Sequence, residues 1–138
     1  MIKRLLFIPL LVSGLSFSLP GHAYTGKTLR DDCLAAETAY AQSGKLDQYS
    51  SPQAARCIAY VEGFADGYAI SEHLAESIGV RLGAFCLPND PNLSYRLVRA
   101  VLAHLERLPP DPQSSTATLV AAALSKTFPC SETLEPRK

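Results

Sequence analysis

Cysteine and histidine are the residues of this chain with the most obvious capacity for chemistry. The 138-residue sequence contains four cysteines and three histidines. No two cysteines are close enough in sequence for the short ligand spacing of a structural zinc site. His73 and His104 each stand alone without a metal-spaced partner, so we interpret them as structural or surface residues. We therefore expect neither a metal nor a cofactor.

The carboxylates give no clearer catalytic signal. Asp31 and Asp32 fall in the first turn of a predicted helix, where negative charge complements the helix dipole. Glu62 and Asp66 are four residues apart on one helical face, which favours a solvated acidic stripe or a charged binding surface over an acid/base pair. The sequence also lacks a Gly-x-Ser-x-Gly motif and a phosphate-binding glycine loop. We therefore predict that the protein is not an enzyme.

Composition narrows the class of protein further. The chain has 13 basic and 13 acidic residues, and 47% of its residues are hydrophobic. A balanced charge argues against a nucleic-acid-binding protein, and this hydrophobic content argues against disorder. The length fits one small domain.

The first 23 residues have the pattern of a signal peptide. Lys3 and Arg4 precede an apolar run over 5–12, and Gly21-His22-Ala23 resembles a small-x-small cleavage site. Pro9 interrupts the run, which is too short for a membrane span. We expect cleavage after residue 23, a mature domain over 24–138, a periplasmic location and no membrane association after cleavage.

Export changes the interpretation of the cysteines. Cys33, Cys57, Cys86 and Cys130 all lie in the mature part, and an even number in an oxidising compartment predicts two disulfides. If the first two helices form an antiparallel hairpin, Cys33 can approach Cys57, and Cys86 would then pair with Cys130. Four cysteines allow three pairings, and the sequence does not exclude the other two.

Helix signals recur along the mature chain and strand signals are almost absent. Ser51-Pro52, Asp90-Pro91 and Asp111-Pro112 each place an N-cap residue before a proline suited to the first helical position. An earlier helix is expected over about 29–42, with Thr28 as its cap and Ser43-Gly44 at its end, and 77–88 is expected to be irregular. The predicted fold is all-α, a compact bundle of four to five helices with two disulfides.

The helix after Ser51-Pro52 carries a stripe of small residues. Ala59, Gly63 and Gly67 share one face, and each glycine inside a helix costs roughly 1 kcal/mol relative to alanine. This cost suggests close approach by another backbone. The stripe is predicted to be a tight helix crossing within the domain or, alternatively, a contact with a second chain.

The neighbourhoods of the cysteines resemble a known family. The motifs are Leu29-x-x-x-Cys33, Cys57-x-x-Tyr60-x-x-Gly63-x-x-Asp66, Phe85-Cys86-Leu87-Pro88 and Leu119-Val120-x-x-Ala123-Leu124-x-x-x-Phe128-Pro129-Cys130. Together they resemble the Tai family, immunity proteins of type VI secretion amidase effectors that are also called resistance-associated proteins. The resemblance covers about 29–130. The turn at Leu108-Pro109-Pro110-Asp111-Pro112 departs from the family's His-Pro-Glu-like turn, and 72–83 matches no family pattern.

The resemblance implies a periplasmic, disulfide-bonded helical protein that binds a peptidoglycan amidase effector and blocks its active-site cleft. It also implies a possible homodimer. Glu62, Asp66, Glu72 and Glu76 form a run of acidic positions that we interpret as a candidate partner-binding surface, although a solvated helix face is the simpler explanation. The alternative function is a small periplasmic helical chaperone or another binding protein of the envelope.

Overall fold

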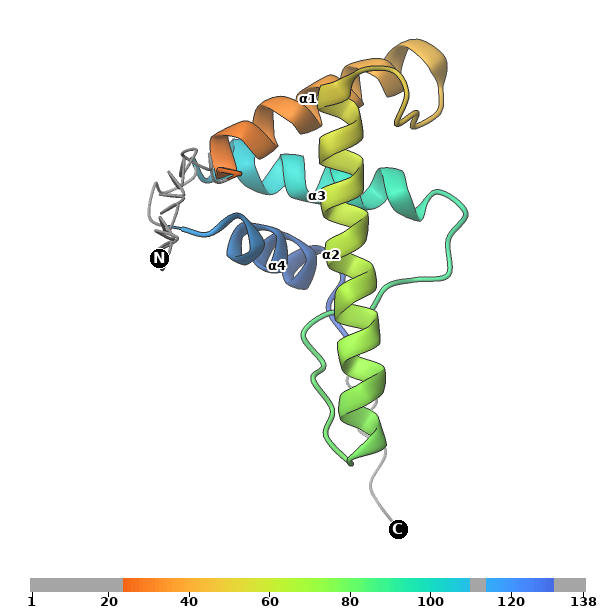
Figure 1. Cartoon of the computed structure of the whole chain (residues 1–138), viewed down its shortest axis with the longest axis vertical. Coiled ribbons are helices and arrows are strands. Elements are labelled where there is room, and N and C mark those ends of the chain that lie inside the picture. The colour runs from red at the N-terminus through yellow and green to blue at the C-terminus, as the bar shows by residue number, and fades with distance from the viewer. Residues whose placement is uncertain (1–23, 110–113, 131–138) are drawn as a thin grey trace, which may run out of the picture.

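Four helices make up the part of the chain that the structure, a computed structural model, describes. This part covers residues 24–109 and 114–130 and contains no strand. The elements are α1 (Gly26–Ser43), α2 (Pro52–Ser77), α3 (Leu93–Arg107) and α4 (Thr116–Thr127). The predicted all-α fold is confirmed, whereas the predicted signal peptide over 1–23 lies outside the described residues. Figure 1 shows α2 as a long upright helix, with α1 crossing its upper end and α3 and α4 lying lower down.

Helix α1 begins earlier than the sequence analysis predicts and ends where it predicts. The cap is Thr25 rather than Thr28, because the Thr25 hydroxyl accepts a hydrogen bond from the Thr28 backbone N–H at 3.1 Å. The helix ends at Gly44, which has a φ of 71° and donates its N–H to the Tyr40 carbonyl. Glycine adopts this left-handed conformation without steric cost.

Helix α2 begins at the predicted Ser-Pro pair. Pro52 occupies the start of the helix, and the Ser51 hydroxyl accepts a hydrogen bond from the Ala54 N–H at 3.0 Å. The helix has 26 residues, which corresponds to a length of about 39 Å. Its buried residues, Ala54, Cys57, Ile58, Val61 and Ala65, all lie within its first 14 residues. The second half therefore extends beyond the core.

The predicted Asp90-Pro91 helix start is wrong. Helix α3 begins at Leu93, because Asp90 instead closes a turn in which its Oδ1 accepts from the Asn92 N–H at 2.8 Å. Helix α4 begins at Thr116, and the Ser115 hydroxyl caps it by accepting from the Thr118 N–H at 3.1 Å. The predicted Asp111-Pro112 pair lies outside the described residues.

The core lies where the four helices meet, and both disulfides are in the pairing favoured by the sequence. Cys33 is bonded to Cys57 between α1 and α2, and both side chains are fully buried. Cys86 is bonded to Cys130, which joins the segment before α3 to the end of α4. The largest fully buried apolar side chains come from every helix and from the α2–α3 connection, namely Leu29, Val61, Phe85, Val98, Val101, Leu102, Leu105, Val120 and Leu124.

A buried carboxylate joins the start of the described chain to two helices. Asp32 on α1 is 2% exposed and accepts hydrogen bonds from Arg56 Nε and Nη2 on α2 at 2.9 and 2.8 Å. The Tyr24 hydroxyl donates to the same carboxylate at 2.9 Å, and the Tyr24 carbonyl accepts from Thr116 on α4. Burial, followed by the bond to Asp32, raises the pKa of Tyr24. The prediction that Asp32 lies in the first turn, where its charge would complement the helix dipole, is wrong, because the helix starts six residues before it.

Candidate partner-binding surface

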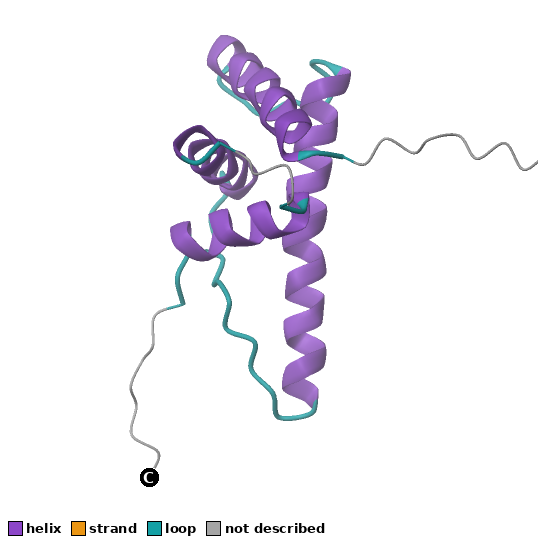
Figure 2. Ribbon diagram, turned by 90° about the vertical axis from the view of Figure 1, so that its left-hand side faces the viewer, coloured by secondary structure: helices purple, strands orange, loops and turns teal. Residues whose placement is uncertain are grey.

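The most prominent feature of the surface is an arm formed by the second half of α2 and the chain that returns from it. We define the arm as residues 66–84. Figure 2 shows this half of α2 standing clear of the other helices, with the return loop running back alongside it. The predicted irregular segment at 77–88 is confirmed, since α2 ends at Ser77 and α3 begins only at Leu93.

The arm is held at its root by several contacts. The Tyr68 ring stacks on the buried Phe85 ring with centroids 4.0 Å apart, and the Tyr68 hydroxyl accepts a hydrogen bond from the Ala84 N–H at 2.7 Å. The Cys86 N–H donates to the Phe128 carbonyl at 2.8 Å beside the Cys86–Cys130 disulfide. The return loop is thus fixed both to α2 and to the end of α4.

Backbone and side-chain hydrogen bonds also order the tip of the arm. Gly79 donates to the Glu76 carbonyl at 3.0 Å, and its φ of 78° permits the reversal of the chain. Glu72 Oε1 accepts from the Gly83 N–H at 3.3 Å, which ties the return loop to α2. Glu76 instead lines a shallow hollow at the tip together with Val80 and Arg81. Of these two predicted partner-binding acids, Glu72 therefore braces the arm and Glu76 lies at its surface.

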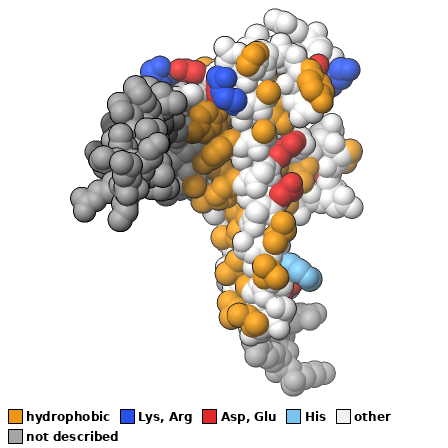
Figure 3. Space-filling model, viewed as in Figure 1, with side chains coloured by type: hydrophobic (Ala, Val, Ile, Leu, Met, Phe, Trp, Pro, Cys, Tyr) orange, Lys and Arg blue, Asp and Glu red, His pale blue; other side chains and the backbone are white. Residues whose placement is uncertain are grey.

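The arm exposes an unusual amount of apolar surface. Five large hydrophobic side chains on it are at least 45% exposed, namely Ile70, Leu74, Ile78, Val80 and Leu82. Figure 3 shows hydrophobic side chains along this lower part of the molecule. Scattered exposed apolar residues are common, but a contiguous group on a projecting element is typical of an interaction site.

The small-residue stripe does not form a tight crossing with another described helix. Ala59, Gly63 and Gly67 are exposed, and a Cβ placed on either glycine would meet no atom within 4 Å. The predicted close approach within the domain is therefore wrong. At 100° per residue these positions share the outward face of α2 with Ile70 and Leu74.

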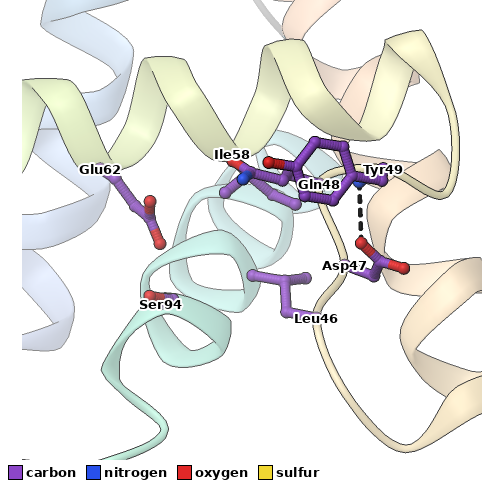
Figure 4. A pocket seen from close by; sticks show the side chains of 7 residues that line it. All are labelled: Leu46, Asp47, Gln48, Tyr49, Ile58, Glu62 and Ser94. Carbon is purple, nitrogen blue, oxygen red and sulfur yellow. Dashed lines mark hydrogen bonds between the residues drawn. The ribbon is translucent and has the colours of Figure 1, made fainter.

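A groove runs along the other flank of α2, between this helix and the start of α3. One hollow of about 340 Å³ is lined by Ile58 and Glu62 of α2, by the α1–α2 loop and by Ser94 of α3. Figure 4 shows Glu62 pointing from α2 toward Ser94, with Leu46 and Asp47 of the α1–α2 loop at the other end of the hollow. A second hollow of about 210 Å³ shares Glu62 and Ser94 and adds Asp66. The remaining two predicted partner-binding acids thus line one groove.

No side chains in residues 24–109 and 114–130 come together as catalytic machinery. All four cysteines are oxidised, and no group of three potential metal ligands occurs in these ranges. His73 is exposed, whereas His104 is 8% exposed. Burial, followed by the charges of Lys126 and Arg107, lowers the pKa of His104. In the same ranges no helix has the length and hydropathy of a membrane span.

These features define a class of protein, namely a small disulfide-stabilised helical scaffold with a projecting arm and a groove lined by two carboxylates. Comparison with protein families then identifies the group. Residues 25–130 match the family model of the Rap1a immunity proteins, and the chain belongs to this family. It is accordingly an immunity protein, a class of protein that acts against a cognate secreted effector.

Neither the curated proteins nor the solved structures contain a match to this chain.

Proposed function

We propose that the protein is a periplasmic immunity protein that binds and sterically blocks a type VI secretion peptidoglycan amidase effector. The arm is the observation that carries this proposal, because it projects from the core, is braced at root and tip, and exposes apolar side chains. A rigid protrusion loses little conformational entropy when it enters a cleft, which favours tight binding. The proposed site of inhibition is the mouth of the amidase active site.

The periplasmic location is part of the same proposal. Two disulfides are typical of an oxidising compartment. Residues 1–23 have the pattern of a signal peptide, and cleavage after residue 23 would leave Tyr24 at the amino terminus. Tyr24 is anchored to Asp32 and Thr116. Mass spectrometry of protein recovered from the periplasm should show a chain that begins at Tyr24.

The test of the proposal is inhibition of a purified amidase encoded beside this gene. The mature protein should bind the enzyme and stop its cleavage of peptidoglycan, with no turnover of its own. Val80→Arg at the tip of the arm should weaken both effects, because it places a charge in the apolar contact and lies outside the proposed dimer face. Leu108→Arg is the matched control, since Leu108 is similarly exposed but lies at the end of α3. Equal effects of the two substitutions would rule out the arm as the contact.

We also propose a homodimer formed by the outward face of α2. The small residues Ala59 and Gly63 and the large residues Ile70 and Leu74 have mirror-symmetric spacing along the helix. In an antiparallel pair of α2 helices, Ile70 would oppose Gly63 and Leu74 would oppose Ala59. Such self-complementarity is what a two-fold interface requires.

Solution mass as a function of concentration tests the dimer. Gly63→Lys should lower the mass from dimer to monomer, because the long side chain fills the site that Ile70 of a second copy would occupy. Ala41→Lys on the exposed face of α1 is the control and should leave the mass unchanged. A wild-type protein that stays monomeric at high concentration would refute the dimer without affecting the inhibition proposal.

The exposed apolar residues of the arm also fit the alternative function, a chaperone that binds unfolded proteins. A chaperone should protect unfolded client proteins at acidic pH, and an immunity protein should not. Aggregation of a denatured client at about pH 3, measured by light scattering, separates the two functions. Family membership favours the immunity function.

A further inference from the structure

The two hollows beside α2 form one continuous groove. They share Glu62 and Ser94, so one wall is α2 and the opposite wall is the first turn of α3. The volumes of about 340 and 210 Å³ are enough for a few side chains but not for a helix. The groove therefore suits a loop of a partner protein.

The part of the groove nearest the arm has an apolar floor. Leu87, Leu93 and Leu97 line it, together with Ala65 of α2. Leu87 directly follows Cys86, whose disulfide and backbone hydrogen bond fix the root of the arm. An apolar side chain lying on this floor would be removed from water, which is the main source of favourable binding energy at such sites. The floor thus selects an aliphatic or aromatic side chain.

The α2 wall of this groove carries two uncompensated negative charges. Glu62 and Asp66 are four residues apart, a spacing at which like charges destabilise a helix by a few tenths of a kcal/mol. Neither forms an ion pair among the described residues, whereas Asp90 and Glu37 are paired with the nearby Arg96 and Arg99. Figure 3 shows acidic side chains midway along α2.

The arginines of α3 are therefore already engaged by other carboxylates. Arg96 Nη1 lies 2.7 Å from Asp90 Oδ2, and Arg99 Nη1 lies 3.1 Å from Glu37 Oε1. A cation that compensates Glu62 and Asp66 is consequently best supplied by a partner. Such a cation would also relieve the repulsion between the two carboxylates, so the charge pattern is complementary to a basic group.

We propose that this groove binds a loop of the effector that presents an arginine or lysine next to an aliphatic or aromatic residue. This inference rests on the proposed function and extends it, because it adds a second contact at the base of the arm. The basic head group lies between Glu62 and Asp66, and the neighbouring apolar side chain lies on Leu87, Leu93 and Leu97. Two separate contacts fix the direction in which the arm enters the cleft.

The test compares two charge-matched double variants in binding to the purified amidase encoded beside this gene. Glu62→Gln with Asp66→Asn removes the groove charges, and Asp31→Asn with Glu106→Gln removes two exposed charges from α1 and α3. The groove variant should bind about tenfold more weakly and show a smaller loss of affinity between low and high salt. The control should bind within about twofold of wild type.

The outcomes separate this inference from the proposed function. Failure of the wild type to bind the amidase would refute the function itself. Wild-type binding with equal affinities for both double variants would refute the groove and leave the function standing. A groove variant with altered solution mass but unaltered amidase affinity would show that a second copy fills the groove, which also overturns the proposal.

Carbodiimide cross-linking of the wild-type complex provides a second measurement that does not depend on the variants. It joins carboxylates directly to amines in contact with them. A cross-link from Glu62 or Asp66 to an amidase lysine supports the proposal. If charge removal has no effect on affinity and the cross-links come only from Glu76 on the arm, the proposal is wrong. Circular dichroism should show the groove variant to be at least as stable as wild type, because a like-charge pair is removed.

Discussion

Replacing both cysteines of one bridge with alanine tests what each disulfide contributes. Cys33 and Cys57 are 24 residues apart, and Cys86 and Cys130 are 44 residues apart. Loop-closure entropy then gives a stabilisation of about 3.5 kcal/mol for the first bridge and about 4 kcal/mol for the second. Both double variants should therefore lose a similar and large part of the free energy of unfolding. Urea unfolding followed by circular dichroism measures this loss.

The two variants should differ in where the chain loosens. The Cys33–Cys57 bridge is buried between α1 and α2, whereas the Cys86–Cys130 bridge holds the root of the arm. Native-state hydrogen exchange over 78–86 should therefore rise only in the Cys86→Ala/Cys130→Ala variant, with the other variant as its control. Equal exchange in the two variants would refute the role of this bridge in fixing the arm. A loss below about 1 kcal/mol in both would refute the entropic estimate.

Three further predictions concern stability. Gly63→Ala and Gly67→Ala should each raise the free energy of unfolding by about 0.5–1 kcal/mol, because an added Cβ meets open space and alanine favours the helix; a loss in urea unfolding would show a close neighbour. Asp32→Asn should lower the free energy of unfolding by about 2 kcal/mol, because charge-assisted hydrogen bonds from Arg56 are lost inside the protein. An unchanged unfolding midpoint would contradict this prediction. Burial lowers the pKa of His104, so the unfolded state takes up the proton first as pH falls, and stability is lost below about pH 6.5. His104→Gln should flatten that decline in a pH series of thermal melts, and an unaltered decline would refute this assignment.

Features set by local chemistry were predictable from the sequence. The Ser51-Pro52 start of α2 and the Gly44 end of α1 depend only on neighbouring backbone groups, and both predictions are confirmed. The disulfide pairing followed from the expected hairpin of the first two helices, which brings Cys33 beside Cys57. In each case the determining contact is close in sequence or is implied by the order of the helices.

The predicted helix start at Asp90 failed because of a competing local interaction. Asp90 has the residue type of an N-cap, but its two oxygens are used by the Asn92 N–H and by Arg96. These bonds, the backbone one first, lower the pKa of Asp90 and hold it in a turn before the helix. Propensity identified Asp90 as a cap-forming residue, but these bonds engage its carboxylate before the helix begins.

The burial of Asp32 could not be predicted, because its partner lies 24 residues away on another helix. Sequence spacing placed Asp31 and Asp32 together as surface charges near a helix terminus. In the structure their environments are opposite, since Asp31 pairs with the exposed Lys27 while Asp32 is enclosed. Which of two adjacent aspartates faces the core depends on the rotation of α1 against α2. That rotation is set by packing over the whole helix pair.

The arm, by contrast, could be predicted from the sequence, but only from the helical face on which the apolar residues lie and not from their number. The buried residues of α2, from Ala54 to Ala65, lie on one side of the helix, at 100° per residue. Ile70 and Leu74 lie roughly half a turn away, on the outward side, while Tyr68 stays on the inner side against Phe85. An apolar stripe that changes face indicates that the helix has left the core and that its exposed side needs a different partner. Helical periodicity alone predicts the helix, but only the change of face predicts where the scaffold ends and the binding surface begins.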